Sequence, residues 1–182
     1  MILFNILFKL VSRFNALVWN GFLGAMPDDL ISKIYTNILK LSGSKIGKNS
    51  LVHHRVHVWY PENIDIGCGT DIPASVDMAG MDKITIGDNS RIGASVRFIT
   101  NHHPYNENVS EEEKRKGSQK PITLENNVFV MNNVLLVAGK NGITIGEYSW
   151  IASGAVVVTD VEPYSLYAGV PAKKVKEIIY RK

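Results

Sequence analysis

Hydrophobic residues recur every six positions along most of this chain. The recurring positions are Ile46, Val52, Val58 and Ile64; Ile66, Ile72, Met78 and Ile84; Ile86, Ile92 and Phe98; Leu124, Val130 and Leu136; and Ile145, Ile151 and Val157. A period of six matches neither the period of about 3.6 of an α-helix nor that of about 2 of a strand. It predicts a hexapeptide β-helix, in which the chain coils into a prism of short parallel strands.

The remaining inward positions of each hexamer support this fold. The residue after the apolar one is often small: Gly47, Gly67, Gly87, Gly93, Gly146 and Ala152. The residue four places on is mostly small or β-branched: Ser50, Val56, Thr70, Val76, Ser90, Val96, Val128, Val134, Ser149 and Ala155. Two inward positions of unequal size fit a narrow prism with tight corners. An ordinary sandwich of short strands would instead alternate apolar and polar residues and space its turns irregularly.

The first 43 residues are expected to be helical. Residues 1–23 would form a helix that is apolar over most of its circumference, but their apolar runs fall short of the roughly 20 residues of a membrane span. Two interpretations stay open for this helix: it packs on the prism or between subunits, or it lies on a membrane surface. Residues 28–42 predict a second helix, which Asp28 or Asp29 caps and Gly43 ends.

The β-helix is predicted to span residues 44–170, with about 18 residues in each of about six coils. Its period breaks at a long loop, residues 102–121, which holds a His-His-Pro sequence and then a charged run. Long loops inside compact repeat arrays are usually functional or disordered. Residues 171–182 are expected to form a closing helix, with Val175, Ile178 and Ile179 on one side.

Composition narrows the function classes only mildly. The 182 residues carry a formal net charge of +3, which is too small to indicate nucleic-acid binding. The single cysteine, Cys68, excludes a disulfide framework and a cysteine zinc cluster. The first residues lack a basic segment before an apolar block, so a signal peptide is not expected. The expected location is cytoplasmic, with peripheral contact at the inner face of the membrane as an open alternative.

Three features together resemble one known family. They are the hexamers, the His-His-Pro of residues 102–104 at the mouth of the loop, and the Ala-Gly-Val-Pro-Ala-Lys ending of residues 168–173. Over residues 46–176 the chain resembles the hexapeptide-repeat acyltransferases, especially the maltose, galactoside and nodulation-factor O-acetyltransferases. The resemblance implies a left-handed parallel β-helix, a homotrimer with active sites between neighbouring prisms, and transfer of acetyl from acetyl-coenzyme A to a sugar hydroxyl.

The resemblance also assigns catalytic roles. The family's general base precedes a proline and follows the last regular apolar position by five residues, which here is His103. An imidazole with a pKa near neutrality suits removal of a hydroxyl proton. His102 is a second candidate for the base, and Asn101 a candidate for orienting the acceptor. The family's oxyanion donor is a backbone amide, here that of Asn132, although Met131 replaces the usual glycine before it.

For the cofactor, the matching positions are Ser153 and Thr159, with Gly139 near the pantetheine and Lys173 and Lys176 near the phosphates. Lysine would act there as a point charge. The sugar contacts of the small-sugar enzymes are not reproduced, because Pro73, Ser75 and Met81 stand where polar groups are common. A larger or membrane-linked acceptor is therefore expected, such as a bacterial surface polysaccharide or its precursor.

Three alternatives stay open. N-acetylation of an amino sugar on a nucleotide carrier would use the same base. A zinc hydro-lyase of the carbonic anhydrase type shares the prism but needs three histidines around one metal ion. The five histidines form two separate groups, and His53, His54 and His57 are expected to be corner or face residues, so no metal is expected. A non-catalytic scaffold would bind no cofactor.

Overall fold

This computed structural model describes residues 26–102, 110, 112 and 118–179. The elements are α2 (Asp28–Leu41), β1 (Lys45–Ile46), β2 (His57–Val58), the 3-10 helix η1 (Pro61–Asn63), β3 (Ile64–Ile66), β4 (Asp77–Ala79), β5 (Ile84–Ile86), β6 (Arg91–Ile92), β7 (Arg97–Ile99), β8 (Asn101–His102), β9 (Ser118–Gln119), β10 (Ile122–Leu124), β11 (Phe129–Val130), β12 (Leu135–Val137), β13 (Ile143–Ile145), β14 (Trp150–Ile151), β15 (Val156–Val157), β16 (Ser165–Ala168) and β17 (Lys173–Glu177).

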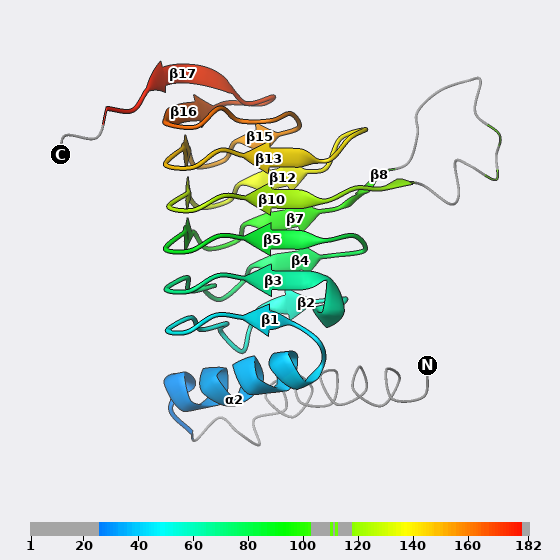
Figure 1. Ribbon diagram of the computed structural model, residues 1–182, viewed down its shortest axis with the longest axis vertical. Coiled ribbons are helices and arrows are strands. Elements are labelled where there is room, and N and C mark those ends of the chain that lie inside the picture. The colour runs from blue at the N-terminus through cyan, green and yellow to red at the C-terminus, as the bar shows by residue number, and fades with distance from the viewer. Residues whose placement is uncertain (1–25, 103–109, 111, 113–117, 180–182) are drawn as a thin grey trace.

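The strands form the three faces of a prism, with α2 at one end and β17 at the other (Figure 1). Sheet I has the order β1-β3-β5-β10-β13, sheet II the order β6-β11-β14-β16-β17, and sheet III the order β2-β4-β7-β12-β15. Neighbouring strands in each sheet are parallel, except for the antiparallel pair β16–β17. The predicted β-helix is therefore confirmed.

Each coil is slightly longer than predicted. Asp65 of β3 pairs with Lys45 of β1 and with Thr85 of β5, so the first coils contain 20 residues rather than about 18. After the loop, Ile122 of β10 pairs with Ile143 of β13, a step of 21 residues. The extra residues lie at the corner between sheets III and I, where η1 and the Met81 turn interrupt the hexamers.

The predicted inward positions form the core. Met78 and Phe98, which neighbour each other across β4 and β7, are completely buried. Glycine is required where successive coils touch at their corners. A Cβ atom on Gly67 would lie 2.7 Å from the backbone nitrogen of Asp88, and one on Gly93 would lie 2.6 Å from that of Asn132. The six-residue pattern therefore records two constraints, an apolar interior and backbone contact at the corners.

Helix α2 confirms the predicted second helix, but its cap differs. The N-cap residue is Pro27, whose carbonyl accepts hydrogen bonds from the backbone of Leu30 and Ile31, and no side chain caps this end. Asp28 and Asp29 lie instead in the first turn, where a negative charge is favourable beside the helix dipole. The helix closes the end of the core through its buried residues Ile31, Ser32, Tyr35, Thr36 and Leu39.

The predicted C-terminal helix is wrong, because residues 173–177 form strand β17. This strand pairs antiparallel with β16, and the next residue, Ile178, donates a hydrogen bond to the carbonyl of Tyr164. The strand thus satisfies the backbone groups of the last edge of sheet II, which a helix would leave open. The supposed apolar side is not buried, since Val175 is 59% exposed and Ile179 87% exposed.

The expected N-terminal helix, residues 1–23, lies outside the described residues. Among the residues that are described, no helix is long and apolar enough to cross a membrane.

Candidate active site

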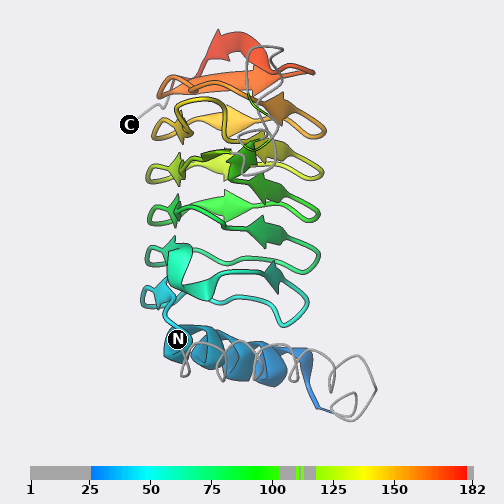
Figure 2. The ribbon, with the colours of Figure 1, turned by 90° about the vertical axis from the view of Figure 1, so that its right-hand side faces the viewer.

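The loop predicted to carry the catalytic base leaves the prism on a two-stranded stem (Figures 1 and 2). In this stem Asn101 of β8 pairs with Gln119 of β9, and His102 pairs with Ser118. The stem starts at the corner between sheets III and I. Thr100 anchors it there, because its buried hydroxyl donates to the carbonyl of Ala79 at 2.8 Å and accepts from the backbone of Asp82 at 3.1 Å.

The structure locates the three predicted catalytic residues only in part. Asn101 is half-buried in the stem, and the backbone of His102 lies beside it. His103, the predicted general base, lies outside the described residues, as does the side chain of His102. The base is therefore placed at the end of the β8–β9 stem by chain connectivity alone.

Two predicted cofactor residues lie along the same corner as the stem. Gly139 follows β12 one coil beyond β7, and the residue before it, Ala138, donates a hydrogen bond to the carbonyl of Ile99. Thr159 follows β15 one coil further on and is exposed. A Cβ atom on Gly139 would lie 3.1 Å from the carbonyl oxygen of Val158, so the backbones approach closely there. The stem, Gly139 and Thr159 thus form a line parallel to the prism axis.

The predicted oxyanion donor lies on a different corner, between sheets II and III. The Asn132 side-chain oxygen accepts a hydrogen bond of 2.9 Å from the backbone of Ala94, and its carbonyl accepts one of 3.0 Å from Gly154. Within the described chain its own backbone N–H has no hydrogen-bond partner. Ser153 lies beside it one coil on, and both residues are exposed. The predicted residues therefore form two groups, separated by the width of sheet III.

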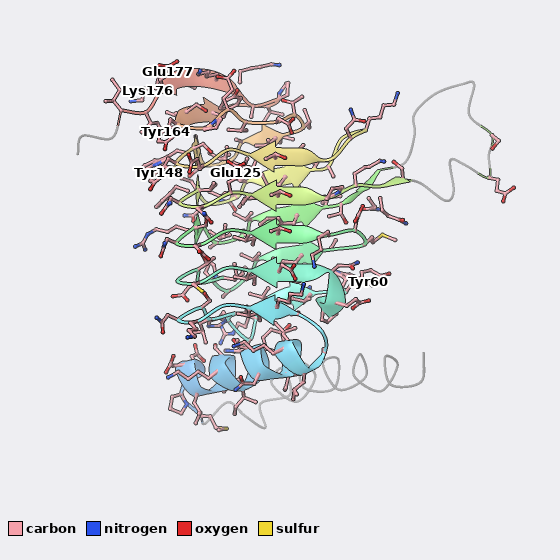
Figure 3. The ribbon with its side chains drawn as sticks, viewed as in Figure 1. Tyr60, Glu125, Tyr148, Tyr164, Lys176 and Glu177 are labelled. Carbon is pink, nitrogen blue, oxygen red and sulfur yellow. The ribbon has the colours of Figure 1, made fainter. Side chains whose placement is uncertain are left out.

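Lys173 and Lys176, predicted to meet the cofactor phosphates, are exposed in β17 at the end of the prism, where Figure 3 labels Lys176. In the part of the chain that the structure describes, neither forms an ion pair. Lys174 between them is engaged instead, since its ammonium group lies 2.6 Å from Glu162 and 3.5 Å from Glu177. The hydrogen bond from Glu162 raises the pKa of Lys174. Two positive charges thus remain available to an anion.

The early histidines differ in their surroundings. His54 is only 2% exposed, because α2 covers it, and its ring stacks on that of His53 with 4.3 Å between centroids. Its Nδ1 atom lies 3.2 Å from the hydroxyl of Ser32 in α2. Desolvation by burial lowers the pKa of both rings. His57 is exposed, as predicted for a face residue. The described residues include no group of three or more His, Cys, Asp or Glu side chains that could hold a metal ion.

The corner between sheets I and II is closed by side-chain contacts. Tyr148 and Tyr164 stack with 5.1 Å between ring centroids, and the Tyr164 hydroxyl donates to Glu147 at 3.1 Å. Figure 3 shows both rings on the edge of the prism away from Tyr60, which lies on the same side as the β8–β9 stem. The predicted catalytic and cofactor residues of the coils therefore border sheet III, not this edge.

A pocket of about 520 Å³ opens on the outer face of sheet III, and the sequence-based predictions did not include it. Its polar lining includes Arg55, His57, Ser75, Asp77, Arg97 and Asn133. A signal was present in the sequence, because residues 57, 77 and 97 are each 20 positions apart. With a coil of 20 residues these three positions coincide on one face, whereas the expected 18 displaces each by two residues.

Comparison with known proteins supports the resemblance. No protein-family model matches the chain. The chain is 31% identical over 144 residues to the galactoside O-acetyltransferase of Escherichia coli K12, covering 78% of this chain and 68% of that protein. It is 41% identical over 61 residues to the 2,3,4,5-tetrahydropyridine-2,6-dicarboxylate N-acetyltransferase of Enterococcus faecalis, covering 34% of this chain and 25% of that protein.

Among solved structures, a hexapeptide-repeat acetyltransferase from Vibrio cholerae, complexed with acetyl-coenzyme A, matches with a TM-score of 0.77 and 25% identity. The match covers 97% of this chain and 89% of that one. The architecture is accordingly the left-handed parallel β-helix of these acetyltransferases. The hexapeptide period, the stem on the prism and the identity to the galactoside enzyme agree, and the chain belongs to the hexapeptide-repeat acetyltransferases.

Proposed function

We propose that this protein is an O-acetyltransferase that moves an acetyl group from acetyl-coenzyme A to a sugar hydroxyl. The observation that carries the proposal is the 31% identity to the galactoside O-acetyltransferase over 144 residues. The acetyl-coenzyme A bound to the Vibrio cholerae relative supports the choice of donor. The proposed acceptor is a bacterial surface polysaccharide or its precursor, acetylated in the cytoplasm or at the inner face of the membrane.

In the proposed reaction His103 acts as the general base. It takes the proton of the acceptor hydroxyl as the oxygen attacks the thioester carbonyl, so a C–O bond forms. The resulting oxyanion accepts a hydrogen bond from the backbone N–H of Asn132. When the C–S bond breaks, the imidazolium returns the proton to the leaving thiolate. Asn101 is proposed to orient the acceptor, and His102 is the second candidate for the base.

The free N–H of Asn132 supports its role as a donor, because a polar group without a partner can bind a developing charge without first giving up another contact. Ser153, Thr159 and Gly139 would line the path of the cofactor, and their exposure fits this role. Lys173 and Lys176 would face the phosphates, which is supported by the absence of ion pairs to them among the described residues.

A homotrimer is part of the proposal. The stem that leads to His103 and the N–H of Asn132 lie on opposite borders of sheet III. A reaction centre that uses both groups is most simply completed by the loop of a neighbouring prism that reaches across to this sheet. Analytical ultracentrifugation would test this directly. A monomer that is fully active would contradict it.

The N-acetyltransferase of Enterococcus faecalis, 41% identical over 61 residues, favours N-acetylation of an amino sugar as a second candidate. Both reactions are tested by supplying acetyl-coenzyme A with matched pairs of acceptors that carry either a hydroxyl or an amine at one position. An ester product is cleaved by mild alkali, whereas an amide is not. Failure of the protein to bind coenzyme A in calorimetry would contradict both candidates and indicate a scaffold.

A further inference from the structure

The pocket on sheet III is lined by a row of charged side chains. His57, Asp77 and Arg97 are direct neighbours across strands β2, β4 and β7. Their side chains point outward, since the residues that follow them, Val58, Met78 and Phe98, face the core and successive residues of a strand alternate. Strands lie about 4.8 Å apart, so the three side chains stand close together on one open face.

The positive groups of this pocket are not used elsewhere in the structure. Arg55 and Arg97 are exposed, and among the described residues neither makes an ion pair or a side-chain hydrogen bond. Arg55 comes from the corner that precedes β2, and the backbone of Ser75, one coil on, donates to its carbonyl at 3.3 Å. Two guanidinium groups on neighbouring walls of one pocket form a site for a planar anion.

The negative group between them is incomplete. The Oδ1 atom of Asp77 is buried and has no hydrogen-bond partner among the described residues. Leaving a buried acceptor unsatisfied is unfavourable, so such groups usually have a structural or functional explanation. A hydroxyl group of a bound molecule would supply the missing donor. The pocket therefore offers groups for both an anion and a hydroxyl.

We infer that this pocket binds an acidic sugar, one that carries a carboxylate or a phosphate together with free hydroxyls. In this arrangement Arg55 and Arg97 bind the anionic group, and Asp77 accepts from a sugar hydroxyl. A volume of about 520 Å³ is large enough to hold one or two sugar units. The sugar's neutral relatives would lose the charge-assisted contacts.

The pocket's position indicates that this sugar belongs to the acceptor, an inference that rests on the proposed function. Asn133, which lines the pocket, directly follows Asn132, the proposed oxyanion donor. On the opposite border, β7 runs from Arg97 to Ile99 and leads directly into the stem of the catalytic loop. An acidic unit bound on sheet III would thus place the adjoining part of a glycan chain between the two groups of site residues.

Binding is tested first, without acetyl-coenzyme A, so that the result does not depend on catalysis. The probes are glucuronic acid disaccharides, glucose 1-phosphate and a neutral glucose disaccharide, titrated by calorimetry or saturation-transfer NMR. The neutral disaccharide is expected to bind at least about tenfold more weakly than one of the acidic probes. Comparison of the two acidic probes shows whether the anion is a carboxylate or a phosphate. No binding of either acidic probe at millimolar concentration would overturn the inference.

Variants then locate the site. Arg97→Gln and Arg55→Gln should each weaken binding of the acidic probe by about tenfold or more, and Asp77→Asn should weaken it while leaving the fold intact. Arg91→Gln is the matched control, because Arg91 is an exposed arginine of the same coil that lies on sheet II. Equal effects of Arg97→Gln and Arg91→Gln would overturn the inference.

Acetyl transfer separates this inference from the proposed function. If acidic and neutral glycans are acetylated equally well and Arg97→Gln has no effect on KM, the pocket inference is wrong although the enzyme is an O-acetyltransferase. If the acidic probe binds in an Arg97-dependent way but coenzyme A does not bind, the proposed function is wrong although the pocket is a sugar site. If both hold, Arg97→Gln should raise the KM of an acidic acceptor by about tenfold and change kcat little.

Discussion

The side-chain oxygen of Asn132 accepts a hydrogen bond of 2.9 Å from the backbone N–H of Ala94 in the preceding coil. The same contact recurs along the prism, where Asp88 accepts from the backbone of Cys68 and Asn126 from that of Asp88. These contacts join successive coils at their corners. At Asn132 the contact also holds the peptide whose N–H is the proposed oxyanion donor.

Replacing Asn132 by alanine should therefore lower both stability and catalysis. The lost hydrogen bond is worth about 1 kcal/mol of unfolding free energy. Because the backbone N–H remains but is held less firmly, kcat should fall and the KM for the acceptor should change little. Asn132→Asp keeps the accepting oxygen and should recover most of the loss. Urea unfolding and steady-state kinetics measure both effects, and an unchanged kcat in Asn132→Ala would contradict the proposed role.

Glycine at position 93 should be needed for the same reason. A Cβ atom there would lie 2.5 Å from the side-chain oxygen of Asn132 and 2.6 Å from its backbone nitrogen. Gly93→Ala should therefore cost about 1–3 kcal/mol of unfolding free energy and displace the proposed donor. Gly67→Ala is the control, since its Cβ atom would lie 2.7 Å from the backbone of Asp88, away from the proposed site. Both variants should be less stable, but at a temperature where both are folded only Gly93→Ala should lose kcat.

The attachment of the catalytic loop should depend on Thr100. Valine has nearly the same shape but lacks the hydroxyl that donates to Ala79 and accepts from Asp82. Thr100→Val would leave these backbone groups unsatisfied at a cost of about 1–3 kcal/mol. Thr100→Ser keeps the hydroxyl and should be milder. Hydrogen exchange of the β8 and β9 amides measures the attachment, and equal protection in Thr100→Val and the wild type would contradict this role.

Much of the fold could be predicted because the prism requires an inward residue at every sixth position. Phe98 and Met78 occupy such positions, and burial of their side chains is a local consequence of the period. The C-terminal helix was mispredicted because Val175, Ile178 and Ile179 have helical spacing. What decides that segment is a distant requirement, the unpaired edge of β16, which sequence periodicity does not record.

The site was predicted less completely than the fold. The resemblance supplied His103 and Asn132, but not the fact that sheet III separates the Asn132 corner from the stem. The row of His57, Asp77 and Arg97 depends on a coil of 20 residues, so a small error in coil length hides it. Burial of His54 under α2 likewise depends on a contact between segments, with Ser32, that no local pattern indicates.

Stability should fall in mild acid because of the His53–His54 pair. Burial, and then the neighbouring ring of His53, lower the pKa of His54, while Asp28 opposes this and Arg55 reinforces it. Since the folded pKa is depressed, the unfolded chain binds the proton more readily. The stabilisation is therefore complete above the unfolded pKa of about 6.5 and is lost as the pH falls through the lower folded pKa.

Urea unfolding at a series of pH values from about 7.5 to 5 measures this dependence. The unfolding free energy of the wild type should decrease with falling pH, and His54→Gln should flatten the decrease even if it lowers the stability at every pH. His57→Gln, which changes an exposed histidine, is the control and should retain the wild-type slope. A wild-type slope in His54→Gln would show that this histidine does not cause the pH dependence.

The most direct test of the proposed function is release of free thiol from acetyl-coenzyme A, measured for the wild type and for His103→Ala with a panel of acidic and neutral glycans. The wild type should release thiol only when a suitable acceptor is present, and His103→Ala should be slower by about a hundredfold or more, as expected on loss of a general base. His103→Ala should still bind coenzyme A with wild-type affinity. Acceptor-dependent release at the wild-type rate by His103→Ala would contradict the assignment of the base and make His102 the next residue to test.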